Sequence, residues 1–451
     1  MTLLEKLTAW TGDAAAILSH NPLTLLIIVG AGLYLTIRLG AVQITGFRHA
    51  INVVRGKYSR SSDQGEVNHF QALSTALSAT VGMGNIAGVA TAIALGGPGA
   101  LFWMWITASV GMATKFTEST LAVKFRQVDK NGDIAGGPMY TLLHGLKMKK
   151  VAIVYAVFAL ITAVVIGNLV QANSVVDGLA FIWPELKQQG WLVGIALAIP
   201  VGLVIIGGIR RIARVASAIV PFMAMLYIFS GIFVLLVHIQ HIPGALATIF
   251  NQALNPWAVG GAAMGEAIRW GVIRGLFSNE AGLGSSAMAH AAARTNEPVR
   301  EGLVAMLEPF VDTLIICTIT GLTIVVTGAY LNNGGTASTS ITAAAFSAGL
   351  GHVGAWVIGV SIILFAFSTM LSWCYYGDRS AEFIFGESAV MPFRIIYTLL
   401  VIVGASIPLR MVWNLADITT VLMAIPNLFA LIGLVVLVKQ LKSSYFERYD
   451  Q

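Results

Sequence analysis

Two short stretches rich in glycine and small polar residues interrupt apolar segments, about 200 residues apart in the chain. The first stretch is Ser78-Ala79-Thr80-Val81-Gly82-Met83-Gly84-Asn85, and the second is Phe277-Ser278-Asn279-Glu280-Ala281-Gly282-Leu283-Gly284-Ser285. Glycine weakens a helix and lets the backbone open. At membrane depth, non-helical backbone is tolerated only where it is buried in protein or lines a watery cavity. Paired interruptions at corresponding positions of two halves therefore predict a binding site between them.

The peptide groups freed by these interruptions suit ligands of opposite charge. In the first stretch, the carbonyls of Ser78–Val81 lose their helical partners and suit a hard cation such as Na⁺. Beyond them, the backbone N–H groups from Met83 onward suit a carboxylate. In the second stretch, the carbonyls near Phe277 and Ser278 suit an ammonium group. A ligand held by both stretches has one anionic and one cationic end, which describes a free amino acid.

Polar side chains in other apolar segments could complete such a site. Gln171 is explained equally well by contact with a ligand and by a hydrogen bond between helices. Ser368 and Thr369 are adjacent and could complete a Na⁺ shell at the Ser78–Val81 carbonyls, although such hydroxyls usually bond to their own helix. Trp373 lies one turn later and is large enough to close a pocket; its alternative role is packing.

Charged residues at this depth are costly and by default have a function or a partner. Glu280 lies inside the second stretch beside Asn279, and we expect it either to contact a ligand or to pair with Arg274. Lys115 and Glu118 are one turn apart, and we expect them to form a structural pair.

The composition places the chain in a membrane. Of its 451 residues, 57% are hydrophobic and only 11% are charged, whereas a soluble domain has about a quarter charged residues. We therefore predict an all-α integral membrane protein. A bilayer crossing needs about 20 apolar residues, and we expect eleven such segments, at 22–45, 68–93, 97–121, 151–177, 189–209, 213–238, 258–292, 302–330, 353–377, 392–409 and 412–438.

The basic residues indicate the topology of these segments. Lys and Arg cluster after every second segment, whereas the opposite side carries only Lys6, Lys187 and Arg410. The positive-inside rule then places the N-terminus outside the cell and the C-terminus in the cytoplasm. Topology explains the net charge of +6, so we expect no nucleic-acid partner. We predict a multi-pass protein of the plasma membrane, surrounded by lipids.

The ten segments after the first divide into two groups of five. Because five is odd, the two groups have inverted topology, and each begins with its glycine-interrupted helix. The predicted parts are an N-terminal region with an interfacial helix, one extra span and a cytoplasmic loop (1–67), a first repeat (68–238), an extracellular connection (239–257), a second repeat (258–438) and a cytoplasmic tail (439–451). We also expect a cytoplasmic loop at 122–150, with a surface helix after Gly136-Gly137-Pro138, and an outer segment at 331–352 with a short helix at 340–350.

Enzyme motifs are absent from the chain. It contains no GxSxG, HExxH or Walker sequence, so we do not expect an enzyme. Cys317 and Cys374 lie inside predicted spans, so we expect no disulfide between them.

In these stretches the sequence resembles the alanine-or-glycine:cation symporter family, the sodium:alanine symporters. The resemblance covers nearly the whole chain and implies a leucine-transporter-type fold, with a five-plus-five inverted repeat and one extra N-terminal span. Four motifs carry it: Gly82-Met83-Gly84-Asn85-Ile86-Ala87-Gly88-Val89-Ala90, Gly96-Gly97-Pro98-Gly99-Ala100-Leu101-Phe102-Trp103-Met104-Trp105, Gly136-Gly137-Pro138-Met139-Tyr140 and Gly275-Leu276-Phe277-Ser278-Asn279-Glu280-Ala281-Gly282-Leu283-Gly284-Ser285.

The resemblance also implies residue roles. It places a cation at the carbonyls of Ser78, Val81 and Phe365 and the hydroxyls of Ser368 and Thr369. It places the substrate carboxylate at the amides of Met83 and Gly84, and the amine near Thr80, Phe277 and Ser278. Together with the reading of the two stretches, it gives the expected substrate contacts Thr80, Gly82, Met83, Gly84, Asn85, Gln171, Phe277, Ser278, Asn279, Gly282 and Trp373. A second cation site at Asn85 and Ser278 would need Asp312 or Thr313 in place of the asparagine expected on the next span.

We therefore predict a secondary active symporter that imports alanine or glycine with Na⁺ by alternating access and works as a monomer. One alternative is H⁺ coupling through Glu280 or Asp312. A substrate-gated sensor or channel is a second alternative, and a polytopic membrane enzyme is a third. The enzyme is disfavoured because no nucleophile and base lie at one depth.

Overall fold

Apolar runs between short polar loops fold into helices, because a helix satisfies its backbone hydrogen bonds internally. The computed structural model of the chain describes residues 3–60, 62–128, 134–254, 262–331 and 339–449. Within these ranges, the α-helices of eight or more residues are α1 (Leu3–Leu18), α2 (Pro22–Arg38), α4 (Phe47–Val54), α5 (His69–Thr80), α6 (Val89–Gly96), α7 (Ala100–Lys124), α9 (Lys149–Val164), α10 (Gln171–Leu179), α11 (Gly190–Ile205), α12 (Gly208–Val237), α13 (Ile242–Leu254), α14 (Ala262–Asn279), α16 (Pro298–Ala305), α18 (Thr318–Thr327), α19 (Thr339–Leu350), α20 (His352–Phe385), α21 (Val390–Gly404) and α22 (Leu409–Tyr449).

Short elements connect or interrupt these helices. They include the π-helical turns η1 (Gly84–Gly88), η2 (Thr141–Gly145), η3 (Val165–Val170) and η6 (Phe310–Cys317), the short helices α3 (Val42–Thr45), α8 (Pro138–Tyr140), α15 (Ala287–Ala291) and α17 (Leu307–Pro309), and the antiparallel strands β1 (Gln127–Val128) and β2 (Ile134–Ala135).

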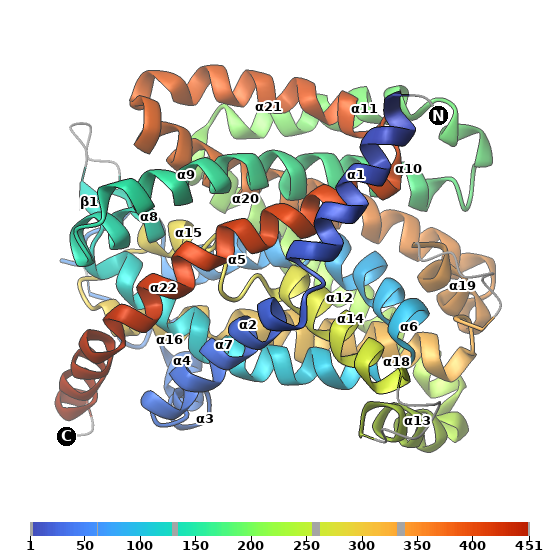
Figure 1. Cartoon of the computed structure of the whole chain (residues 1–451), viewed down its shortest axis with the longest axis horizontal. Coiled ribbons are helices and arrows are strands. Elements are labelled where there is room, and N and C mark those ends of the chain that lie inside the picture. Colours follow the sequence, from blue (N-terminus) through green and yellow to red (C-terminus); the bar gives the residue numbers. More distant parts are fainter. Residues whose placement is uncertain (1–2, 61, 129–133, 255–261, 332–338, 450–451) are drawn as a thin grey trace.

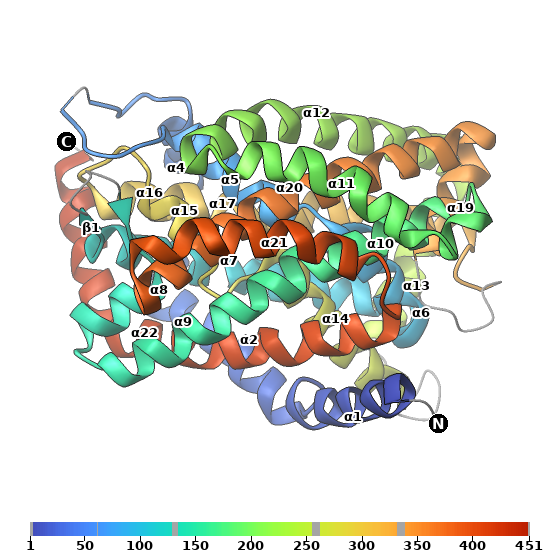
Figure 2. The same cartoon turned by 90° about the horizontal axis from the view of Figure 1, so that it is seen from above.

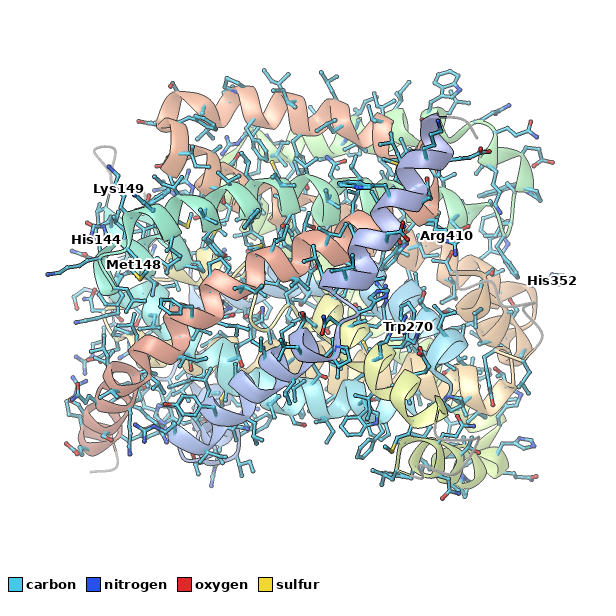
Figure 3. The ribbon with its side chains drawn as sticks, in the orientation of Figure 1. His144, Met148, Lys149, Trp270, His352 and Arg410 are labelled. Carbon is cyan, nitrogen blue, oxygen red and sulfur yellow. The ribbon has the colours of Figure 1, made fainter. Side chains whose placement is uncertain are left out.

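The long helices run lengthwise through the bundle, so that the connections collect at its two ends (Figure 1). One end carries α3, α4, α8 and the last turns of α22; we call it the basic end, and His144, Met148 and Lys149 lie there (Figure 3). The opposite end carries α13 and α19, and His352 lies there (Figure 3). Seen from above, α1 lies along one edge of the bundle and α12 along the opposite edge (Figure 2).

In the described residues, the segments predicted from hydropathy are mostly helical, with short non-helical breaks in several of them. Six helical stretches are long and apolar enough to cross a membrane, and this number rises to eight if two bent helix pairs each count as one span. The described part of the chain thus confirms a multi-pass helical architecture, whereas the count of eleven spans and the inverted repeat stay predictions. Large apolar side chains also face outward, among them Ile199 and Phe229, which are 60% and 66% exposed. Such a surface suits lipid rather than water.

Both predicted helix interruptions are present. In the first, α5 begins at a capping box formed by Asn68 and Gln71 and ends at Thr80, with Val81 as its C-cap, and its axis bends by 49° to that of the next helical segment. In the second, α14 continues through Asn279, one residue beyond its expected end at Phe277-Ser278. Glu280 then takes a positive φ of 55°. The helix is longer than predicted because the Glu280 N–H still bonds the Leu276 carbonyl at 2.9 Å.

The connections differ in part from the expectations. The N-terminal helix is present as α1, and its axis bends by 51° to that of α2. The predicted outer helix is present as α19. The helix after Gly136-Gly137 is present as α8 and η2, with Pro138 and Met139 buried and His144 exposed. Residues 255–261 and 332–338, which hold the start of the predicted 258–292 span and part of the 239–257 and 331–352 connections, lie outside the described residues.

Glycine allows close helix crossings in this bundle. Gly167, in η3, lies so close to α20 that a Cβ atom there would be 2.1 Å from the Cβ of Trp373. Contacts below 3 Å require the neighbours to move, and Trp373 is completely buried. A side chain at position 167 would therefore separate η3 from α20.

We expect Gly167→Ala to lower the free energy of unfolding, since overpacking a tight interior site typically costs about 1–3 kcal/mol. The measurement is thermal unfolding of the purified full-length chain in detergent. Gly30→Ala is the matched control, because a Cβ there meets no atom within 4 Å. Equal melting temperatures for the two variants would contradict the packing account.

Candidate functional site

The two interrupted helices touch each other at Gly84 and Ser278. A Cβ atom on Gly84 would lie 2.9 Å from the Ser278 Cα and 3.3 Å from the ring of Phe277. Only glycine allows this approach without displacing the facing backbone. Ser278 and the residues around Gly84 are buried, so the two interruptions meet inside the bundle.

Three π-helical turns bring polar residues to this point. Asn85 lies in η1, Gln171 directly follows η3, and Asp312 lies in η6. All three side chains are buried. A π-turn adds a residue to a helical turn and occurs frequently at functional sites.

The first interruption keeps backbone donors available. The Gly82 N–H donates to the Asn85 side-chain oxygen at 2.8 Å. None of the hydrogen bonds between described residues uses the N–H groups of Met83 and Gly84. Because an unpaired buried N–H is rare and costly, these two groups are candidates for an anionic ligand, as the sequence suggested.

Gln171 has an unused acceptor beside these donors. Its Nε2 donates to the Ile166 carbonyl at 3.0 Å, whereas its buried Oε1 has no partner among the described residues. A Cβ on Gly82 would lie 3.6 Å from this oxygen, so Oε1 lies close to the opened backbone. The Thr80 hydroxyl instead bonds back to the carbonyls of Ala76 and Leu77.

Oxygen atoms gather where α5 meets α20. The Ser368 hydroxyl lies 3.0 Å from the Phe365 carbonyl and 3.4 Å from the Ser78 carbonyl. The Thr369 hydroxyl lies 3.4 Å from the Ala79 carbonyl. Carbonyl and hydroxyl oxygens are the donors that hard cations prefer, so these residues fit Na⁺. No described contact involves the Val81 carbonyl, and its role as a ligand stays a prediction.

A buried carboxylate connects the two interruptions. Asp312 accepts hydrogen bonds from Asn85 Nδ2 at 2.6 Å and from Ser278 Oγ at 2.8 Å. The Thr313 hydroxyl also donates to it at 2.7 Å. The structure thus brings together the four residues considered for a second cation site. Within the described residues, Asp312 forms no ion pair with a basic side chain.

The second interruption is held by two side chains from neighbouring helices. Glu118 Oε1 accepts the N–H groups of Gly282 and Gly284 at 2.8 and 3.1 Å. Asn427 donates to the Gly282 carbonyl and to Glu118, each at 2.8 Å. The peptide groups of Gly282 are therefore used within the protein, which leaves the expected substrate contact at Gly282 without a free backbone group.

Two expected ion pairs are wrong. Lys115 does not pair with Glu118 but lies 2.9 Å from Glu308, because Glu118 turns toward the glycine amides. Arg274 does not pair with Glu280 but lies 2.7 Å from Asp417.

Glu280 is held by neutral donors instead. It accepts hydrogen bonds from the Ser285 hydroxyl and from Trp373 Nε1, the latter at 2.9 Å. The Asn279 side chain accepts the Ala281 N–H at 3.0 Å. Neither contact tests whether Trp373 or Asn279 faces a substrate.

A large cavity leads toward the site from the end opposite the basic end. It has a volume of about 1560 Å³, and Trp270 and Arg410, which line it, are labelled in Figure 3. Arg274, Trp413 and Asp417 line its inner part. The guanidinium of Arg274 lies 4.9 Å from the Trp413 ring centroid, and that ring lies 4.8 Å from the ring of Phe277. This stack connects the lining of the cavity to Phe277 at the second interruption.

Several of these residues were not found from the sequence. Asn427 and Asp417 are polar residues inside an apolar run, which is itself a signal of function, and neither was selected. Trp413 gave no signal, because a lone aromatic residue in a span is most often packing. The long-range pairing of Glu118 with the glycine amides depends on tertiary structure alone.

Comparisons with known proteins agree with this architecture. The model of the sodium:alanine symporter family matches residues 4–451. The sodium/alanine symporter AgcS of Methanococcus maripaludis is 46% identical over 418 residues, 91% of each chain. An uncharacterized transporter of Haemophilus influenzae is 45% identical over 440 residues, 95% of each chain.

Solved structures show the same fold at low sequence identity. The structure of MhsT in complex with L-phenylalanine aligns with a TM-score of 0.62 at 12% identity, over 82% of this chain and 89% of that chain. A manganese transporter of Eremococcus coleocola aligns with a TM-score of 0.53 at 12% identity, over 80% of this chain and 79% of that chain. The leucine-transporter-type fold is thereby confirmed.

We expect Asn427→Ala to lower the free energy of unfolding by about 2 kcal/mol, because it removes a donor from a buried carboxylate and leaves the Gly282 carbonyl unpaired. Thermal unfolding of the purified chain measures the effect. Asn414→Ala on the same helix is the control, since Asn414 makes only long bonds of 3.3 and 3.4 Å. If the control loses as much stability as Asn427→Ala, the hydrogen bonds of Asn427 and Glu118 around Gly282 are not a main source of stability.

Proposed function

The chain belongs to the sodium:alanine symporter family, and we propose that it imports alanine or glycine together with Na⁺ by alternating access. It is a multi-pass membrane protein and an amino acid symporter, not an enzyme. One observation carries the proposal: unused peptide donors and an unused side-chain acceptor lie together where the two interrupted helices meet.

The proposed amino acid lies across the first interruption. Its carboxylate accepts the N–H groups of Met83 and Gly84, and its ammonium group donates to Gln171 Oε1. Desolvating a carboxylate costs several kcal/mol, and two or three hydrogen bonds to charged groups, at about 1.5–3 kcal/mol each, are of the right size to offset it.

The proposed Na⁺ lies between α5 and α20 and is coordinated by Ser78, Val81, Phe365, Ser368 and Thr369. A Cβ on Gly82 would lie 2.6 Å from the Thr369 hydroxyl, so the cation ligands adjoin the opened backbone. An ion bound there would fix the conformation that presents Met83 and Gly84 to the substrate. One Na⁺ entering down 100 mV contributes about 2.3 kcal/mol.

Selection of a very small substrate is proposed to be steric. One methylene group in an apolar pocket changes binding by only about 1–3 kcal/mol, so exclusion needs walls that cannot move. Phe277 and Trp373 are the proposed walls, and Thr80, Asn85, Ser278, Asn279 and Gly282 complete the proposed surroundings. Both aromatic side chains are buried and packed against other rings, which limits their movement.

The proposed orientation of the chain in the membrane is based on the distribution of its basic residues. The basic end faces the cytoplasm and the 1560 Å³ cavity opens outside, with the N-terminus outside and the C-terminus inside. We further propose eleven spans with a five-plus-five inverted repeat, a location in the plasma membrane, contact with lipid and a monomeric functional unit.

H⁺ coupling is a second candidate that Asp312 favours. Its carboxylate is buried between the two interruptions and is bonded to neutral donors only, among the described residues. A protonated carboxyl at this position could replace a second cation.

The two couplings and a passive channel are separated by one experiment. We expect purified protein in proteoliposomes to accumulate labelled alanine against its gradient when Na⁺ enters. Uptake at low pH in Na⁺-free buffer would instead indicate H⁺ coupling. Equilibration without accumulation would indicate a channel. Competition by a panel of amino acids defines the substrate range.

We expect Thr369→Ala to raise the Na⁺ concentration for half-maximal uptake by about tenfold, the equivalent of 1.4 kcal/mol from a lost ligand. The alanine affinity at saturating Na⁺ should change less. Ser380→Ala on the same helix is the control, because its hydroxyl bonds only the Tyr376 carbonyl of its own helix. Unchanged Na⁺ dependence in Thr369→Ala would remove this residue from the cation site.

We expect Gln171→Leu to weaken alanine binding by at least about tenfold, because the ammonium group loses its acceptor and remains desolvated. Equilibrium binding of labelled alanine at saturating Na⁺ measures the change. Ser174→Ala is the control, since Ser174 lies on the same helix but lines the 1560 Å³ cavity, which we call the outer cavity. Equal alanine affinity in the Gln171 and Ser174 variants argues against the proposed pose.

A further inference from the structure

Two backbone segments pair at the basic end of the interrupted helices. One precedes α5 and the other follows α15. The N–H of Glu66 donates to the Ala292 carbonyl at 2.9 Å, and the N–H of Arg294 donates to the Val67 carbonyl at 2.7 Å. The N–H of Thr295 also donates to the Gln64 carbonyl at 3.0 Å. We call this pairing of residues 64–67 with 292–295 the seam.

The seam joins the segments that flank the two interrupted helices. Its first segment leads into α5, which carries the first interruption, and its second segment comes from α15, which follows the second interruption. A path from the site to the basic end between these helices requires the seam to separate.

Arg126 lies across the seam. Its Nη1 donates to the carbonyls of Ala291 and Ala293, each at 2.8 Å. Its Nη2 donates to the Gln64 carbonyl at 3.0 Å and to the Thr295 carbonyl at 2.6 Å. One guanidinium group therefore binds both segments at once.

The charge of Arg126 is used in an unusual way. In the described part of the chain, none of the ion pairs within 4.0 Å includes Arg126, and all four of its bonds go to neutral carbonyls. Hydrogen bonds to a charged donor are stronger than neutral ones. When the seam separates, the Gln64 carbonyl moves with one segment and the other three carbonyls with the other segment. Arg126 cannot follow both.

We propose that Arg126 holds the basic-end gate closed, and that releasing its bonds is part of opening toward the basic end. The inference rests on the proposed alternating access. Arg126 is a positioning residue: it contacts neither the substrate nor the cation, and it stabilises the conformation in which the outer cavity is present. The Gly136 turn supports it, because a Cβ there would lie 3.2 Å from the Arg126 Cβ and 2.4 Å from the Ala291 Cβ.

The test measures access to the two sides of the site in the full-length chain, purified in lipid nanodiscs with saturating Na⁺. Two single reporter cysteines are introduced in separate chains. Ala289→Cys lies on α15 behind the seam and is buried, and Thr91→Cys lines the outer cavity. The readout is the rate of labelling by a polar maleimide, with the chain that lacks a reporter as the blank.

We expect Arg126→Gln to speed labelling of Ala289→Cys by about tenfold, the change in equilibrium that one hydrogen bond to a charged group brings, and to slow labelling of Thr91→Cys. Arg126→Lys should fall between wild type and Arg126→Gln, because a compact ammonium has three donors and no planar fork. Lys124→Gln is the control. Lys124 is exposed and lies two residues before Arg126, so this variant removes the same charge and should leave both labelling rates unchanged. A merely structural role would speed both reporters together and would overturn the proposal, as would rates equal to those of Lys124→Gln.

Gly65→Ala tests the gate without changing Arg126. Gly65 has a φ of +148°, and a Cβ there would lie 2.4 Å from the Ala293 carbonyl oxygen. The variant should shift both reporters in the same directions as Arg126→Gln, and unchanged rates would show that the seam is not the gate. Alanine uptake into proteoliposomes is measured separately. Absence of Na⁺-driven uptake in the wild type contradicts the proposed function, whereas the labelling rates test the gate alone.

Discussion

The structure depends on peptide groups that lack helical hydrogen-bond partners at the centre of an apolar bundle. Opening a helix at Val81–Gly84 and again after Asn279 leaves N–H and C=O groups without helical partners, and in lipid each unpaired group costs several kcal/mol. Several buried polar side chains form hydrogen bonds that satisfy these peptide groups or hold the interruptions in place. Glu118 and Asn427 bind the second interruption, and Asn85 and Asp312 bind the first interruption to Ser278.

The two interruptions are satisfied to different extents. Around Gly282 and Gly284, the protein supplies its own donors and acceptors. Around Met83 and Gly84, two N–H groups remain, and Gln171 offers an acceptor beside them. From this asymmetry we propose that the first interruption binds the substrate and that the second supports it. Near the interruptions, Glu118, Glu280 and Asp312 bind neutral donors rather than basic side chains.

The sequence sufficed for the helical fold and for the positions of the two interruptions, because apolar length, glycine pairs and family motifs are local signals. The interruptions and the all-helical fold are confirmed, and family membership agrees with motifs such as Gly275–Ser285. The ion-pair partners of the buried charged side chains were harder to predict from the sequence. Lys115 stands one turn from Glu118, yet Glu308 is its partner, and Arg274 bonds Asp417, 143 residues away. Such choices depend on which helices meet, and spacing along one helix carries no information about them. The cation and substrate contacts remain predictions for the same reason.

The most direct measurement is a density map of the full-length chain with bound Na⁺ and alanine, at a resolution that shows the ligand. The account predicts an open backbone at Val81–Gly84, with the alanine carboxylate within about 3 Å of the Met83 and Gly84 nitrogens and the ammonium group beside Gln171 Oε1. A continuous helix through residues 78–88, or alanine bound away from both interruptions, would contradict it.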